Sequence, residues 1–446
     1  MNITIFSVGT QGDVRPFIAL GQGLQNKGHT VRIASGKTCE ALVRDNGLDF
    51  AELSADFLEV MAKDPRALQR GLNPFALMST ARHHLKTMAA DWAAQGLAAA
   101  KDADLLLGNG MVAVLANSLA EALKIPMVET HLQPVTPCPD IPPMMMPPPK
   151  RPRGGRANIL LYTVLRTVTW QMLSPAYGMV RRELGLSALP WYGPYYRISH
   201  EDRRILYAYS PSLLPRSTAW PQGIQVCGNW FFNEAKTWQA PDELQAFLDA
   251  GEPPVYIGFG SMLGDDADAL SKIIYEGLRR TGKRAIIATG WGGMTPPDGN
   301  QNNIHVIQSA PHDWLFPRVA MAIHHGGAGT TAATIRAGIP SVVIPFFGDQ
   351  PFWAWRLAEN GIAPPALNRK ALSPDILAQA IAQASASTMQ DAARAMAKCI
   401  NAEDGVARAI SLLEDWGYIP PVEGATTTAA ESAPIPAKES SFAQPA

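Results

Sequence analysis

The chain has 446 residues, a formal net charge of -1, 47% hydrophobic residues and 17% charged residues. This length accommodates two large domains, and such a chain buries enough apolar surface to fold without disulfides or a structural metal. The balanced charge gives no reason to expect nucleic acid as a partner. The cysteines form no CxxC pair, no run of about 18 apolar residues predicts a spanning helix, and the N-terminus lacks a signal-peptide pattern. Disordered, collagenous and integral-membrane classes are excluded, and we expect a soluble, cytoplasmic protein.

Short apolar runs rich in β-branched residues alternate with helical spacing through the first part of the chain. The runs predict strands over residues 3–8, 30–35, 104–108 and 126–130. The helical spacing predicts helices over residues 17–27, 74–100, 112–123 and 157–184. Strands that alternate with helices indicate an α/β fold with a parallel sheet and right-handed crossovers. The proline-rich stretch 133–156 interrupts this rhythm, and we interpret it as a functional loop.

A second alternating series begins near Pro253. It predicts strands over residues 255–259, 285–289, 305–308, 321–324 and 341–345. It predicts helices over residues 267–281, 330–337 and 350–360. We therefore expect a first domain over 1–230 and a second over 243–418. The last stretch, 419–446, is rich in Ala, Pro, Thr, Ser and Glu and is expected to be a disordered tail.

The motif HHGGAGTT at 324–331 lies between an apolar strand and a helix. Its glycines, Gly327 and Gly329 among them, let the backbone approach an anion, and the N–H groups of the following helix face that anion. Thr330, Thr331 and His325 can add hydrogen bonds to a phosphate. The alternative is a tight turn with a capping threonine.

Two further turns follow predicted strands of the second series. In GFGSM, Gly260 and Ser261 can bind a diphosphate from the opposite side, or form a plain strand-to-helix turn. In FGDQP, Asp349 and Gln350 can bind vicinal sugar hydroxyls, or Asp349 can cap the next helix.

The first strand ends in GTQGDV, which places Asp13 at a predicted helix start. We expect the helix N-terminus to lower the pKa of Asp13. An oriented carboxylate at this position can take a proton from an acceptor hydroxyl. The alternative is an ordinary acidic residue in the first turn of a helix.

Three segments together resemble the UDP-glycosyltransferase superfamily: SVGTQGDVRPFIALGQGLQNKGHTVRIAS, PPVYIGFGSM, and the stretch from SAPHDWLF to FFGDQPFWAWRL. They look most like the sterol 3-β-glucosyltransferase branch and next the bacterial antibiotic glycosyltransferases. The resemblance implies a GT-B fold, in which two Rossmann-like domains face a cleft. It also implies an inverting transfer of a hexose, expected to be glucose, from a UDP-sugar to a hydroxyl, with no metal and no other cofactor.

The resemblance assigns roles to individual positions. Asp13 matches the catalytic base. Asp349 and Gln350 match the residues that hold the sugar hydroxyls. The remaining matches concern UDP: Ser261 and His325 on the diphosphate with Gly260, Gly327, Gly329, Thr330 and Thr331 around them, and Ala310 and His312 near the uracil.

Two positions depart from the plant members of the superfamily. Ser309 stands where they carry a tryptophan that stacks on uracil, and Ala333 stands where they carry a glutamate near the ribose. Trp291 can stack on the base instead, or pack in the core. UDP stays our expectation over TDP because the sterol branch uses UDP-glucose.

The acceptor is expected to be an apolar small molecule: a sterol, a hopanoid, another lipid, or a polyketide, macrolide or aromatic aglycone. Met144 and Met145 in the proline-rich loop can line its pocket, since methionines adapt to irregular ligands, or simply pack the loop. His131 can orient the acceptor hydroxyl or serve a structural role.

A basic cluster, Lys150, Arg151, Arg153 and Arg156, precedes the apolar helix predicted from residue 157. Such a cluster can dock at the surface of an anionic membrane, or can be an ordinary solvated charge run.

Three other classes of protein are alternatives to a glycosyltransferase. A UDP-sugar 2-epimerase needs no acceptor pocket, and the apolar methionine loop argues against it. A dinucleotide oxidoreductase would carry GxGxxG, and an acidic residue where Ser35 and Gly36 end the second strand. A non-catalytic binding module stays an alternative if Asp13 lies outside the cleft.

Overall fold

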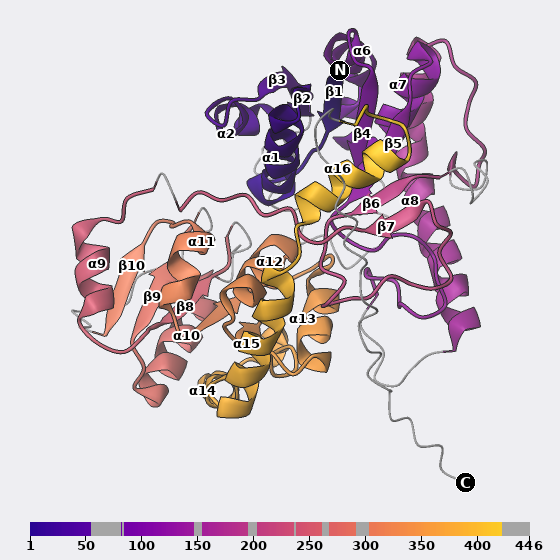
Figure 1. Cartoon of the computed structure of the whole chain (residues 1–446). Helices are drawn as coiled ribbons and strands as arrows, with labels where there is room; N and C mark the ends of the chain where they lie inside the picture. The colour runs from indigo at the N-terminus through magenta and orange to yellow at the C-terminus, as the bar shows by residue number, and fades with distance from the viewer. Residues whose placement is uncertain are drawn as a thin grey trace.

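The chain forms two α/β units, each built on a parallel sheet, in the computed structural model shown in Figure 1. The structure describes residues 1–54, 82, 84–146, 154–194, 203–235, 238–260, 267–290 and 303–421.

The first sheet has seven strands in the order β3-β2-β1-β4-β5-β6-β7, all paired in parallel. The strands are β1 (Asn2–Phe6), β2 (Thr30–Ser35), β3 (Asp49–Glu52), β4 (Leu105–Asn109), β5 (Met127–His131), β6 (Ile205–Tyr207) and β7 (Ile224–Val226). Its helices are α1 (Gln11–Asn26), α2 (Glu40–Arg44), α6 (Trp92–Ala100), α7 (Ala113–Leu123) and α8 (Gly155–Glu183). Side chains of α1 pack in one apolar cluster of this domain and those of α6, α7 and α8 in another, so the central strands are buried and read as continuous apolar runs.

The second sheet has five parallel strands in the order β10-β9-β8-β11-β12. The strands are β8 (Val255–Gly258), β9 (Ala285–Ala288), β10 (Ile304–Ile307), β11 (Met321–His324) and β12 (Ser341–Val343). The helices are α9 (Asp242–Asp249), α10 (Ala267–Thr281), α11 (His312–Leu315), α12 (Ala328–Ala337), α13 (Gln350–Glu359), α14 (Pro374–Ala384), α15 (Ser387–Asn401) and α16 (Gly405–Asp415).

The strand order reverses once in each sheet. The position of each reversal determines where a ligand can bind. In the first sheet β1 lies between β2 and β4, and in the second β8 lies between β9 and β11. Loops diverge at such a switch point, so a crevice opens beyond the carboxyl ends of the strands. Asp13 follows β1, Gly260 follows β8 and the HHGG segment follows β11, which places all three at these two crevices.

The C-terminal helix α16 belongs to the first domain by packing, although it follows the second in sequence. It crosses from α15 back to α1 (Figure 1), and Ile410 and Leu413 join the apolar cluster of the first domain. Ile419, at the start of the predicted tail, is buried in the same cluster, whereas residues 422–446 lie outside the described part of the chain. A third apolar cluster joins the domains, with Tyr209 of the first and Trp353 of the second in edge contact.

Candidate functional site

The glycine-rich segment after β11 leads into the N-terminus of α12. Gly326 has φ +93, and a Cβ there would lie 2.7 Å from Val343, so this turn requires glycine. Its N–H donates to Nδ1 of His324 at 3.1 Å. Gly327 is the N-cap, and no side chain caps the first turn. The capping alternative for Thr330 and Thr331 is therefore not what the structure shows, and the helix keeps unpaired N–H groups at its start.

A cavity of about 970 Å³ opens between the two domains at this helix start. Gln11 and Gly12 line it from the first domain, and Ala333 of α12 from the second. The lining also includes six of the predicted nucleotide-binding residues, namely Gly260, Ala310, His312, Gly329, Thr330 and Thr331. The predicted Ser261 and Trp291 lie outside the described residues. The structure thus brings most of the predicted diphosphate and base contacts to one cavity.

Two predicted ligand-binding histidines, His312 and His325, are neutral at physiological pH, and of these His312 lines the cavity. Burial lowers the pKa of His325 to about 4. Burial, with the charge of Arg15, lowers the pKa of His312 to about 4 as well. Nδ1 of His325 is buried and has no hydrogen-bond partner within the described part of the chain. His325 can therefore give an anion a hydrogen bond but no positive charge.

Asp13 is held at the start of α1 by its neighbour Thr10. Its Oδ2 accepts from the N–H of Thr10 at 2.8 Å and from the Thr10 hydroxyl at 3.1 Å. Gly9 has φ +139, and a Cβ there would lie 2.3 Å from the same oxygen. The backbone thus makes room for this one carboxylate.

The expected lowering of the Asp13 pKa is wrong. Burial raises the pKa, the two hydrogen bonds from Thr10 oppose the rise, and the charge of Asp349 adds to it. Loss of hydration outweighs the helix N-terminus here. The charge of Asp349, in the other domain, therefore acts on Asp13, which is consistent with the predicted base and the predicted sugar site being close in space.

Asp349 precedes α13 but does not cap it. It occupies the N-cap position without a side-chain bond to the helix backbone. Its Oδ2 accepts instead from Nε1 of Trp353 at 2.9 Å and from Nε2 of Gln133, in the first domain, at 3.1 Å. Gln350 is buried, and its side-chain oxygen accepts from the N–H of Phe346 at 2.7 Å. Gln350 therefore shapes the loop, and its contact with a sugar stays a prediction.

A second cavity, of about 290 Å³, lies in the first domain and has a mainly apolar lining. His131, Met144 and Met145, the three predicted acceptor residues, all line it. Gln133 lines it too, so one side chain of this cavity also bonds Asp349, a predicted sugar-binding residue.

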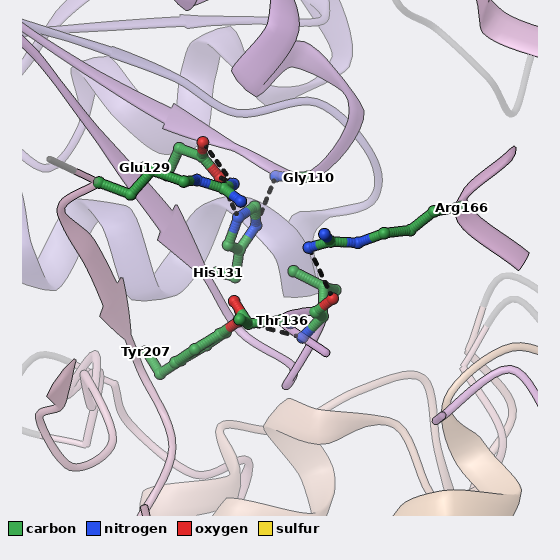
Figure 2. A network of polar contacts seen from close by, with 8 residues as sticks. Gly110, Glu129, His131, Thr136, Arg166 and Tyr207 are labelled. Carbon is green, nitrogen blue, oxygen red and sulfur yellow. Dashed lines mark hydrogen bonds and ion pairs between the residues drawn. The ribbon is translucent and has the colours of Figure 1, made fainter. Parts of the chain in front are cut away.

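A buried polar network forms one wall of this second cavity (Figure 2). Nδ1 of His131 accepts from the N–H of Gly110 at 3.3 Å, so Nε2 carries the proton and donates to Glu129 at 3.2 Å. Arg203 donates to both oxygens of Glu129 at 2.8 Å. Burial alone would raise the pKa of Glu129, but Arg203 and His131 lower it to about 2. The network locks His131 in one tautomer. Glu129 and Arg203 were not predicted from the sequence.

Helix α8 presents two faces at the second cavity. Tyr162 and Leu165 line the cavity. Leu160 and Val164, on another face, are 65% and 50% exposed. Met145, which also lines the cavity, is 61% exposed and so lies at its rim. Of the basic cluster, Arg156 is exposed at the start of α8, and Lys150, Arg151 and Arg153 lie outside the described residues.

Within the described ranges, no helix is long and apolar enough to cross a bilayer. In the same ranges, no cluster of three or more His, Cys, Asp or Glu side chains is arranged to hold a metal ion.

Family models identify both halves of the chain. Residues 3–137 match the glycosyltransferase family 28 N-terminal domain, and residues 297–409 match the erythromycin biosynthesis protein CIII-like C-terminal domain. Among solved structures, the glycotransferase of kitacinnamycin superposes with a TM-score of 0.68 at 19% identity, covering 94% of this chain and 99% of that one. The glycosyltransferase SnogD from Streptomyces nogalater superposes with a TM-score of 0.64 at 19% identity, covering 93% of this chain and 100% of that one. These likenesses confirm the predicted GT-B fold.

Sequence relatives narrow the family. A sterol 3-beta-glucosyltransferase of Arabidopsis thaliana is 34% identical over 94% of this chain and 68% of its own length. A sterol 3-beta-glucosyltransferase of Neosartorya fischeri is 33% identical over 93% of this chain, which spans only 29% of that protein. The chain belongs to the family of the sterol 3-beta-glucosyltransferases.

Proposed function

We propose that the chain is an inverting glycosyltransferase that moves glucose from UDP-glucose to a hydroxyl of an apolar acceptor, such as a sterol. The observation that carries this proposal is the position of Asp13: its neighbours Gln11 and Gly12 line the interdomain cavity, and the charge of Asp349 from the other domain acts on its carboxylate. The names of the relatives support glucose and a sterol as the two substrates.

In the proposed reaction, the acceptor oxygen forms a bond to the anomeric carbon as the bond from that carbon to the diphosphate oxygen breaks. The acceptor proton passes to Asp13, and UDP leaves with the bonding electron pair. Attack from the face opposite the leaving group inverts the anomeric configuration. The raised pKa of Asp13 makes it a stronger base than an exposed aspartate.

The leaving diphosphate gains charge as its bond to the sugar breaks. In the proposal, the N–H groups at the start of α12 and a hydrogen bond from neutral His325 stabilise this charge. Such donors are already in position, so they need no reorganisation during the reaction.

The second cavity supports transfer over the rival epimerase reaction, since an epimerase needs no second substrate. Its lining is mainly apolar and includes Met144, Met145 and His131, as expected for an apolar acceptor with one polar end. Turnover of UDP-glucose with a panel of sterols and aromatic aglycones tests the proposal. Glucosylated sterol is the expected product. Binding of UDP-glucose without transfer to any of these acceptors would contradict the proposal.

We further propose that α8 contacts an anionic membrane surface from which the acceptor enters the cavity. Leu160 and Val164 expose apolar side chains beside a cavity whose rim holds Met145, and Arg156 adds positive charge at the same end of α8. Apolar side chains flanked by basic residues bind anionic bilayers.

Liposome co-sedimentation tests the membrane contact. The variant Leu160→Glu/Val164→Glu should bind vesicles containing phosphatidylserine several-fold more weakly than wild type. The matched control is Ile376→Glu, at a 40% exposed position on α14 of the second domain, which should leave binding unchanged. Equal sedimentation of all three proteins would contradict the proposal.

A further inference from the structure

Gln133 connects the second cavity to Asp349 of the second domain. It follows β5 in the first domain and lines the second cavity. Its side-chain amide donates across the domains to Asp349 at 3.1 Å, over a sequence separation of 216 residues. An acceptor in the second cavity would therefore contact a side chain that is already bonded to the proposed sugar site.

The bond from Gln133 has a defined effect on Asp349. Burial raises the pKa of Asp349, and hydrogen bonds from Trp353 and Gln133 oppose that rise. Both donors bind Oδ2, and the backbone N–H of Asp349 itself adds a further hydrogen bond to the carboxylate. Gln133 thus helps to keep the carboxylate ionised and restrains its orientation.

We propose that Gln133 is a positioning residue that couples acceptor binding to the placement of the donor sugar, an inference that rests on the proposed function. An acceptor that packs against Gln133 restricts its rotamers and so strengthens its bond to Asp349. The sugar is then held most firmly when the acceptor is present. The same coupling disfavours transfer of glucose to water, because the empty cavity leaves Gln133 less ordered.

The proposed coupling predicts a change in the ratio of the affinities for UDP-glucose and UDP, which a purely structural contact would leave unchanged. Gln133 bonds the residue proposed to hold the sugar. Removing the Gln133 amide should therefore weaken the binding of UDP-glucose without weakening the binding of UDP. A contact that only joins the domains would instead affect both ligands equally. The ratio of the two affinities therefore isolates the sugar contribution.

The experiment compares wild type with Gln133→Met, which keeps the length of the side chain and removes the donor. Gln133→Asn serves as a second variant, since it keeps an amide that is too short to reach Asp349. Trp353→Phe is the donor-side control, because it removes the other bond to the same oxygen and lies outside the acceptor cavity. Calorimetry on the full chain gives the affinities for UDP and for UDP-glucose, with and without a water-soluble sterol analogue that lacks the acceptor hydroxyl and so cannot be glucosylated.

We expect the preference for UDP-glucose over UDP to fall by about tenfold in Gln133→Met, the loss typical of one hydrogen bond to a charged group. In wild type and Trp353→Phe, the sterol should tighten UDP-glucose binding. In both Gln133 variants, the sterol should have no effect on it.

The inference would be overturned if Gln133→Met kept both the wild-type preference for UDP-glucose over UDP and the wild-type tightening of UDP-glucose binding by the sterol. It would also be overturned if the variant lost affinity for UDP and UDP-glucose equally. Failure of the proposed function is a different result. In that case wild type itself would transfer no glucose to a sterol acceptor and would show no preference for UDP-glucose over UDP.

Discussion

Replacing Asp13 by asparagine separates proton transfer from every other role of this side chain. Oδ2 of Asp13 accepts from the N–H and the hydroxyl of Thr10. An asparagine oxygen can accept both bonds, so the turn before α1 should keep its shape. The asparagine amide, however, cannot accept the proton of the acceptor hydroxyl. A positioned general base contributes roughly 10²- to 10⁴-fold to a rate, and we expect kcat/KM to fall by that factor.

The pH dependence of kcat/KM in wild type is a second test of the role of Asp13. Burial raises the pKa of Asp13 above its ordinary value of 3.8. The protonated form is inactive as a base, so the acid limb of kcat/KM should have its midpoint above that value. A raised pKa also means that the stability contributed by the carboxyl is present at low pH and is lost as the pH rises through the folded-state pKa. Asp13→Asn should therefore melt at an equal or higher temperature than wild type at pH 7.

The assay is UDP-glucose turnover with a sterol acceptor, combined with calorimetry of UDP. The affinity for UDP should stay within about twofold of wild type, because Asp13 does not line the nucleotide cavity. Asp45→Asn, at an exposed position after α2, is the control and should change neither quantity. An unchanged transfer rate in Asp13→Asn would remove Asp13 as the base.

Three further predictions concern the groups around Asp13, the diphosphate and the acceptor. His325→Ala should bind UDP at least about tenfold more weakly by calorimetry, because it removes a buried hydrogen-bond donor proposed to contact the diphosphate. UDP binding equal to wild type would reject this contact. Gly9→Ala should displace the Asp13 carboxylate and abolish most transfer, whereas Gly47→Ala, at φ +78 in open space, should retain it; equal activities would refute the packing argument. Arg203→Met should destabilise the chain by roughly 3 to 5 kcal/mol in denaturant unfolding, since it strands the Glu129 carboxylate, while exposed Arg182→Met should cost little. A small loss of unfolding free energy in Arg203→Met would show that the Glu129–Arg203 pair adds little to the stability of the chain.

The glycine turns were predictable because their function depends on local sequence. HHGGAGTT and GTQGDV each combine a strand end, glycines and a helix start, and parallel sheets bring such turns to one edge. The direction of the Asp13 pKa was not predictable, because a helix start is visible in the sequence and the burial of a carboxylate between two domains is not.

Interactions over long sequence separations could not be predicted from one sequence. Asp349 stands where a helix cap is expected, and its actual partners include Gln133, 216 residues away. The pairing of Glu129 with Arg203 spans 74 residues and follows only from the neighbouring positions of β5 and β6. The return of α16 to the first domain likewise depends on packing against α1.

The central claim is that the acceptor hydroxyl, with Asp13 as its base, attacks the donor sugar from the side opposite the leaving diphosphate. Proton NMR of the glycoside formed from UDP-glucose and a sterol tests it most directly, because UDP-glucose is an α-anomer. The account predicts a product whose anomeric coupling constant is that of a β-glucoside. An α-glucoside would contradict it.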